Sequence, residues 1–171
     1  MSVIWAKILE FFKIILIVFG IISVYPKVTG DNFFIYRNFK KKSVINAQFR
    51  CSNLINPYIK GIIDSGIEVD LTYRIKTYVE RELVYNEIFS QKISFDGTNY
   101  IVNDWKLKSF SLMTNFLTIQ DLVFLTNADS FSGKGITTEV EIVLKSDYIP
   151  DIINLWGNRP KIILNYLILG D

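Results

Sequence analysis

Acidic side chains are the catalytic residue type that this sequence offers in number. Five of them lie on or near two long stretches of alternating residues: Glu68, Asp70, Glu80, Glu82 and Glu87. Two carboxylates that converge in a cleft could perform general acid and base chemistry, as in glycoside hydrolysis. Glu68 and Asp70 alternate with apolar residues, however, which is the spacing of the solvent-facing side of a strand. We therefore predict that these carboxylates cover a wet sheet face, and a carboxylate-dependent enzyme is the least favoured interpretation.

Histidine is absent from the 171-residue chain, and cysteine occurs once. Without histidine, the Ser-His-Asp and Cys-His catalytic arrangements and the usual zinc sites cannot form. The single cysteine, Cys51, has no C-x-x-C partner, so we predict that it is a buried apolar residue rather than a reactive thiol. The sequence thus indicates no catalytic residue, no cofactor-binding residue and no metal ligand. We expect a protein that is not an enzyme and needs no cofactor.

Residues 132–135, with the sequence SGKG, resemble a phosphate-binding loop in composition only. The G-x-x-x-x-G-K-[ST] spacing is missing, and the residue after Lys134 is glycine, so no hydroxyl is placed to bind Mg²⁺. A loop that needs glycine backbone angles is the better interpretation. Residues 129–133 do not form a D-x-D-x-D-G calcium loop either. We therefore expect no metal partner.

The charge of the chain does not indicate a nucleic-acid partner. The formal net charge is +2, and it is +1 without residues 1–25. Proteins that bind nucleic acids usually gather a strong basic excess on one face. The one dense basic run, Lys40-Lys41-Lys42, is predicted to be an exposed turn between two strands, with contact to anionic lipid as the alternative.

The first thirty residues carry the signature of export or membrane anchoring. Residues 14–24, IILIVFGIISV, form an uninterrupted apolar run after Lys7 and Lys13, as in a signal peptide. Flanking aromatic residues extend the run towards a spanning helix, so a cleaved signal and an uncleaved anchor both stay open, beside a buried core helix. No A-x-A cleavage site follows, which favours the anchor. We predict membrane contact through residues 8–25 and a cell-envelope location on the periplasmic side of the inner membrane, anchored or released.

The positive-inside rule argues for the opposite orientation of this segment. Lys27, Arg37 and residues 40–42 follow the apolar run within about 20 residues, whereas only Lys7 and Lys13 precede it. Lysines inside a folded hairpin influence the membrane orientation of a segment less than a basic leader at the extreme N-terminus does. We therefore retain the prediction that the domain lies outside the cytoplasm.

Residues 31–171 are predicted to form a single β-rich domain. Hydrophobic residues make up 50% of the chain and charged residues 21%, which favours an ordered globular protein. The predicted strands are 31–37, 43–51, 67–80, 83–95, 100–102, 136–144 and 161–169, with a hairpin turn at Asp96-Gly97. Within the strand 67–80, Leu71 is placed in the core and Thr72 on the wet face.

Two short helices interrupt the predicted strands. Asn56-Pro57 begins the first, and Gly66 ends it. The second covers residues 111–125, with an apolar face made of Leu112, Phe116, Ile119 and Val123. The predicted fold class is therefore α+β and β-rich: an antiparallel sheet or β-sandwich with two short helices, preceded by an N-terminal hydrophobic signal or anchor helix.

The stretch 56–78, NPYIKGIIDSGIEVDLTYRIKTY, resembles the bacterial domain of unknown function 4390 family, in which a short helix ends at glycine and leads into a long alternating strand. Further segments are similar to later parts of that family, in the same order: 83–95, 110–125, 139–144 and the pair Ile149-Pro150. The resemblance covers residues 44–170. It implies an exported or membrane-anchored envelope protein of unknown activity, sometimes encoded near a sensor histidine kinase, and it implies no functional residues.

These observations favour a non-enzymatic envelope module that binds a protein partner, and the resemblance implies a role accessory to a sensor kinase. A strand edge or a sheet face is the natural binding surface for such a module. The main alternative is a carrier of lipid or another apolar ligand, which needs an enclosed apolar cavity between sheet and helices.

Overall fold

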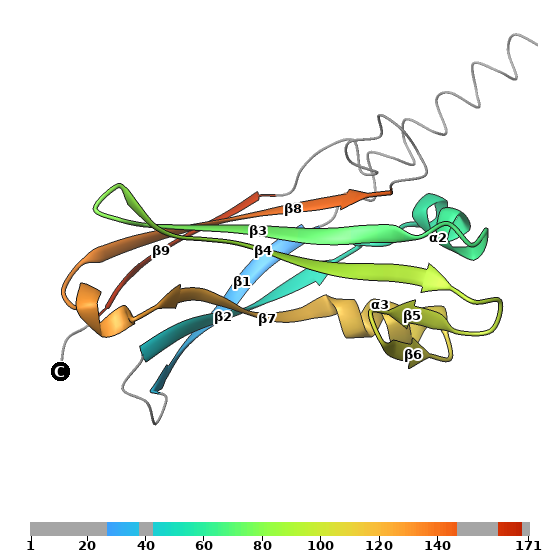
Figure 1. Ribbon diagram of the computed structural model, residues 1–171, viewed down its shortest axis with the longest axis horizontal. Helices are drawn as coiled ribbons and strands as arrows, with labels where there is room; N and C mark the ends of the chain where they lie inside the picture. The colour runs from blue at the N-terminus through green and yellow to red at the C-terminus, as the bar shows by residue number, and fades with distance from the viewer. Residues whose placement is uncertain (1–26, 38–42, 147–160, 169–171) are drawn as a thin grey trace, which may run out of the picture.

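Two antiparallel sheets and two short helices make up the computed structural model, which describes residues 27–37, 43–146 and 161–168 (Figure 1). The three-stranded sheet has the order β1-β2-β7, with β1 at Lys27–Arg37, β2 at Ser43–Ser52 and β7 at Ile119–Thr126. The six-stranded sheet has the order β6-β5-β4-β3-β8-β9. Its strands are β3 (Val69–Val79), β4 (Glu82–Phe95), β5 (Tyr100–Val102), β6 (Trp105–Leu107), β8 (Gly135–Lys145) and β9 (Lys161–Leu167).

The core lies between the two sheets and continues under the helices. Its largest cluster combines Phe124 of the three-stranded sheet with Leu71 and Ile142 of the six-stranded sheet. Helix α2 (Pro57–Asp64) contributes Ile59 and Ile63, and helix α3 (Phe110–Thr118) contributes Met113 and Leu117. The two helices therefore cover one end of the space between the sheets (Figure 1). The predicted β-rich α+β class is confirmed.

Strand β3 lies in the middle of the six-stranded sheet because both of its edges are paired, with β4 and with β8. Its odd-numbered residues, including Leu71, Tyr73 and Ile75, are buried, as the alternating sequence predicted. The prediction for Thr72 is wrong: this residue is buried on the opposite face, and its hydroxyl lies 3.1 Å from that of Ser90 on β4. A buried position on the expected wet face cannot be deduced from alternation alone.

The predicted ends of helix α2 are confirmed. The Asn56 side chain accepts a hydrogen bond of 2.9 Å from the backbone N–H of Ile59, and proline follows Asn56 at the first helical position. Such a cap satisfies a backbone donor that the first turn leaves without a partner. Gly66, with φ +86, then reverses the chain into β3. This φ lies in the left-handed region, which glycine enters without steric cost.

The hairpin predicted at Asp96-Gly97 is also confirmed. The Asp96 carboxylate accepts bonds of 2.9 and 2.7 Å from the backbone N–H groups of Thr98 and Asn99, and Gly97 has φ +90. These N–H donors lower the pKa of the Asp96 carboxyl. The side-chain acceptor fixes the turn, so β5 returns antiparallel to the last residues of β4.

The prediction of one helix over residues 111–125 is wrong in its second half and in its apolar face. Helix α3 ends at Thr118, and the following residues form β7, which pairs with β2. Met113 and Leu117 are the buried helical residues, whereas Leu112 and Phe116 are exposed. The predicted apolar face had spacings of four, three and four residues, and this pattern also fits a helix that is followed by a strand. Pairing with β2 then decides the outcome, because a distant strand supplies hydrogen bonds that local spacing cannot reveal.

A chain of buried hydroxyls crosses the core from one sheet to the other. The Tyr166 hydroxyl on β9 lies 3.1 Å from Thr138 Oγ1 on β8, which lies 2.8 Å from Thr77 Oγ1 on β3. Thr77 Oγ1 donates a bond of 2.6 Å to the backbone carbonyl of Phe124 on β7. This hydroxyl chain separates the large apolar cluster from a smaller one, which contains Ile45, Val79, Leu125, Ala128, Ile136 and Ile168.

Several predicted segments lie outside the described residues. They are the hydrophobic segment 1–26, including the predicted membrane contact at 8–25, the basic turn 40–42 and the segment 147–160. Strand β1 already begins at Lys27, within the predicted leader of residues 1–30, and pairs with β2 as expected. Within the described part of the chain, no helix has the length and apolar character needed to cross a membrane.

Candidate functional site

Two of the predicted wet-face carboxylates, Glu68 and Glu80, and two further glutamates on β8 pair with basic side chains of neighbouring elements. Each pair joins one carboxylate to one cation: Glu68 to Lys92 at 2.7 Å, Glu80 to Lys134 at 3.2 Å, Glu141 to Arg74 at 3.4 Å and Glu139 to Lys161 at 2.9 Å. These ion pairs are partly exposed to solvent, where each contributes little to stability. Four acidic residues thus face cations rather than one another. Such an arrangement does not provide the paired carboxylates that acid–base catalysis needs.

Cys51 is buried, as predicted, on β2 next to Tyr73. Burial raises the pKa of the Cys51 thiol from 9.0 to about 12, and a hydrogen bond with Tyr73 opposes this only in part. Because the thiolate is the nucleophilic form, the thiol is unreactive at neutral pH. The described residues also contain no group of three or more Cys, Asp or Glu side chains that could hold a metal ion.

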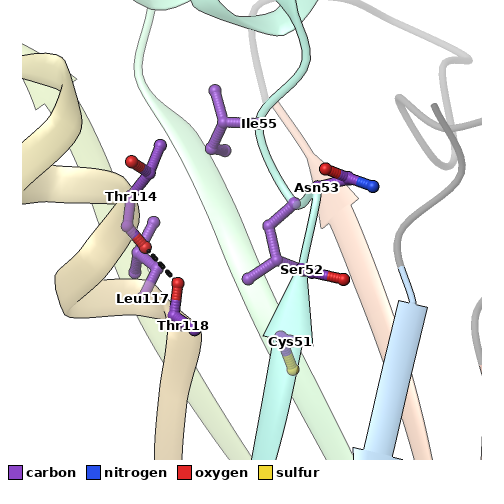
Figure 2. A pocket seen from close by; sticks show the side chains of 8 residues that line it. Cys51, Ser52, Asn53, Ile55, Thr114, Leu117 and Thr118 are labelled. Atoms are coloured by element: carbon purple, nitrogen blue, oxygen red, sulfur yellow. Dashed lines mark hydrogen bonds between the residues drawn. The ribbon is translucent and has the colours of Figure 1, made fainter.

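A pocket of about 280 Å³ opens between helix α3 and the turn that follows β2 (Figure 2). Its lining combines apolar and polar side chains: Cys51, Ser52, Asn53, Leu54, Ile55, Thr114, Leu117 and Thr118. The Thr118 and Thr114 hydroxyls donate to backbone carbonyls of their own helix, at 2.8 and 3.0 Å. In Figure 2 the Asn53 carboxamide points away from that helix. The pocket therefore has a mixed lining and not the continuous apolar lining that a lipid chain requires.

A titratable cluster joins helix α2 to β5 and α3. Lys60 pairs with Asp64 one turn later, and the Tyr100 hydroxyl donates a bond of 2.6 Å to Asp64. The Lys60 ammonium also lies 5.3 Å from the centre of the Phe110 ring. The bond with Lys60, followed by that with Tyr100, lowers the pKa of the Asp64 carboxyl. Every member of this cluster bonds to another member, so we assign it a structural role.

Residues 132–134 form a loop, as predicted for the glycine-rich residues 132–135, and Gly135 is already the first residue of β8. This loop links the short 3-10 helix η1 (Ala128–Phe131) to β8. Gly133 has φ +76 and donates a backbone bond of 2.8 Å to the carbonyl of Ile168. The loop thus uses glycine for its backbone conformation and ties the end of β9 to the start of β8.

An exposed apolar surface lies where β6 meets α3. The rings of Trp105 and Phe116 are 6.1 Å apart between centroids, and Leu112 lies one helical turn before Phe116. Trp105 is 65% exposed, and all three side chains are accessible. We call these three residues the Trp105 surface. Nothing in its charge indicates what it contacts.

Strand β4 has an open edge along most of its length, although the outer edges of β1, β7 and β9 are also without a partner strand among the described residues. On one side, β4 pairs with β3 from Glu82 to Ile93, whereas on the other side β5 covers only Ile93 to Phe95. At Lys92 the backbone N–H donates to the Asn103 side chain at 2.9 Å, and the Lys92 carbonyl accepts from Asn103 N–H at 2.8 Å. Asn103 therefore ends the ladder. No described strand pairs with residues 82–91 on this side, and we call these residues the β4 edge.

Apolar side chains on both faces of the sheet are exposed along the β4 edge. Ile88 is 64% exposed and pairs with Arg74, on the outer face of the sheet. Phe89 is 39% exposed and pairs with Tyr73, on the face that carries the core. Natural proteins usually protect strand edges, and a long apolar edge is a template for another strand. This combination makes the β4 edge the best candidate for a binding surface.

The acidic residues along this side of the molecule form no ion pair with any described residue. They are Glu82 and Glu87 on β4, and both are exposed. Among the carboxylates singled out in the sequence, Glu82 and Glu87 thus differ from Glu68 and Glu80, whose charges are neutralised.

Sequence reasoning correctly placed β4 but missed its open edge. The three-residue strand 100–102 was predicted, but strand order depends on which distant segments pair, and no local pattern states that the rest of this side of β4 lacks a partner among the described strands. One signal was available: Ile88 and Phe89 are consecutive apolar residues in a stretch of exposed positions. In an alternating strand, such a pair indicates that both faces bear an apolar side chain.

Comparison with protein-family models, with curated proteins and with solved structures gave no match to this chain.

Proposed function

We propose that this protein is a non-enzymatic module of the cell envelope that binds a protein partner through the β4 edge. The open edge of residues 82–91 carries the proposal, because it combines unpaired backbone groups with exposed Ile88 and Phe89. Addition of a strand to such an edge is a common mode of protein recognition. The buried Cys51 thiol and the ion-paired carboxylates support a binding role over a catalytic one.

The envelope location rests on the sequence. Residues 14–24 form the apolar run of a signal or anchor, and Lys7 and Lys13 precede it. The resemblance to the domain of unknown function 4390 family implies the same compartment, with a sensor kinase as one candidate partner. An anchored or released domain on the periplasmic side of the inner membrane would meet other envelope proteins without entering the cytoplasm.

Site-specific photo-crosslinking in cells tests the proposed partner. A photoreactive amino acid would replace Ile88 on the β4 edge, Trp105 on the Trp105 surface, or Tyr58 on α2. These three side chains are equally accessible, at 64%, 65% and 63% exposed, so reactivity through exposure alone would be similar. We expect a discrete product with a second protein from position 88 and none from position 58. The mass and peptide composition of the product would identify the partner.

The outcomes separate the binding role from the surface used. A product with another protein from position 105 alone would retain the binding role and move it to the Trp105 surface. The absence of any product from positions 88 and 105, with the protein at its normal level, would refute the binding role.

A fusion experiment tests the location independently. A reporter that is active only outside the cytoplasm, fused after Asp171, should be active, because the basic leader directs the domain outwards. Changing Lys40, Lys41 and Lys42 to glutamine should leave this activity unchanged if those lysines belong to an exported hairpin. Silence of this reporter, together with activity of a cytoplasmic reporter at the same position, would refute the envelope assignment.

A further inference from the structure

We infer that the ligand of the β4 edge is an extended segment of the partner with two consecutive apolar residues followed or preceded by a lysine or arginine. The three ligand residues would lie opposite Phe89, Ile88 and Glu87, respectively. This inference rests on the proposed function and specifies its ligand. It is argued below from the backbone, the apolar side chains and the charge of the edge.

The contact at Lys92 shows which residues of β4 direct their backbone N–H and C=O groups to the open side. Both the N–H and the C=O of Lys92 face the open side, because both bond to Asn103. In an antiparallel strand, alternate residues direct their backbone groups to the same edge. The register with β3 is uninterrupted between Tyr85 and Ile93, so Ser90, Ile88 and Asn86 also face outwards. Three N–H and three C=O groups are therefore available to an added strand.

The side chains of the β4 edge determine which side chains of an added strand would pack well against it. Residues that lie directly opposite in a sheet share a face and contact each other. A ligand residue opposite Phe89 would cover a ring that is 6.1 Å from the buried Tyr73 ring and still 39% exposed. The next ligand residue would lie on the other face and cover Ile88. Apolar side chains at both positions would remove exposed apolar area from water.

Charge determines which residue the ligand needs at its third position, opposite Glu87. Glu87 pairs in register with Ile75, on the face that carries the core, whereas the nearest strand lysine, Lys76, pairs with Asn86 and lies on the other face. Glu82, at the start of the β4 edge, is a second exposed carboxylate, and neither Glu82 nor Glu87 forms an ion pair with a described residue. A basic ligand side chain opposite Glu87 complements this charge, and an acidic one would be repelled.

A synthetic peptide tests the inference with the full-length chain in detergent micelles. The basic peptide alternates threonine and valine around a central Val-Ile-Lys, so that it is extended and soluble. The acidic peptide replaces the lysine with glutamate. A third, N-methylated peptide keeps the side chains but cannot donate backbone hydrogen bonds to the edge. We expect the basic peptide to bind, measured by fluorescence anisotropy, and the other two to bind at least about tenfold more weakly.

Two variants of the protein and one control locate the binding. The Ile88→Pro substitution removes an outward-facing N–H without breaking a bond to β3, and proline is tolerated at sheet edges. Glu87→Lys reverses the selecting charge and should transfer the preference to the acidic peptide. Asp129→Lys, at an exposed position in η1, makes the same charge change elsewhere. We expect Ile88→Pro to abolish binding and Asp129→Lys to leave it unchanged, with near-native melting temperatures for all three variants.

Each other outcome overturns the inference. Equal binding of the basic and acidic peptides would refute the charge rule, and binding that survives Ile88→Pro would refute the edge. Slow amide hydrogen exchange at Asn86, Ile88 and Ser90 without any peptide would mean that a second copy or another segment of this chain already covers the edge. If no peptide bound while position 105 crosslinked to a partner, the inference would be refuted, and the binding role would be retained at the Trp105 surface.

Discussion

Single side chains in this fold owe their importance to the strand face on which they lie. Leu71 is in the centre of β3, fully buried between β4 and β8, while Lys76 on the same strand is exposed. We predict that Leu71→Ala lowers the free energy of unfolding by about 2–5 kcal/mol, because it removes buried methyl groups and leaves a cavity. Lys76→Ala should change it by less than about 0.5 kcal/mol.

Urea denaturation of both variants measures these changes. Equal shifts of the two transition midpoints would show that the assigned faces of β3 are wrong, since a one-residue slip exchanges the two faces. Thr72 is unsuitable as the exposed control, although its place in the alternation suggests it, because its side chain is buried against Ser90.

The Cys51 thiol makes stability depend on alkaline pH. Its pKa is raised from 9.0 to about 12 by burial, so the unfolded chain loses this proton first as the pH rises. The Cys51 contribution to the free energy of unfolding is thus complete below pH 9 and declines up to about pH 12. We predict that Cys51→Ala makes the decline between these values shallower, measured by urea titrations at several pH values. The parent and variant would have parallel pH profiles if the thiol titrated normally in the folded state.

Helix α2 offers the clearest test of an element end. Removing the Asn56 side chain leaves the N–H of Ile59 without its acceptor at the start of the helix. We predict that Asn56→Ala costs about 1 kcal/mol, whereas Asn56→Asp, which keeps an acceptor, costs much less. Thermal unfolding followed by circular dichroism measures both. An equal loss of stability in the two variants would show that the cap contributes nothing.

Elements whose signals are local could be predicted from the sequence. The cap at Asn56, the turn at Asp96-Gly97 and the alternation of β3 each arise within a few residues, and all three are confirmed. The end of α3 is different, because residues 119–126 become a strand only through pairing with β2, some 70 residues earlier in the chain. The β4 edge is equally non-local, since it exists only because no other described strand pairs with that side of β4. No catalytic or metal-binding residue was predicted, and the binding surface became visible only with the strand order.

The two sheets are linked by the hydroxyl chain, and this link can be tested. Thr77 Oγ1 donates to the Phe124 carbonyl across the core. We predict that Thr77→Val costs about 1–3 kcal/mol, because it withdraws a buried donor, although the size of the side chain is kept. Thr137 is the matched control, since its hydroxyl bonds Asn165 in an exposed position and should contribute less than about 1 kcal/mol. Equal effects of Thr77→Val and Thr137→Val would assign no special role to the inter-sheet bond.

The same hydroxyl chain has a direction. Each hydroxyl carries one proton, and Thr77 uses its own to reach the Phe124 carbonyl, so Thr138 must donate to Thr77, and Tyr166 must donate to Thr138. Reversing any one donor would leave two protons, or none, between a pair of oxygens. The Phe124 carbonyl of the three-stranded sheet can only accept, so it fixes the donor direction of every bond in the chain, up to the Tyr166 hydroxyl on β9. Sliding of one sheet over the other would break the Thr77–Phe124 bond, and the proton of Thr77 could then turn to Thr138 only if the Thr138 and Tyr166 protons also turned away.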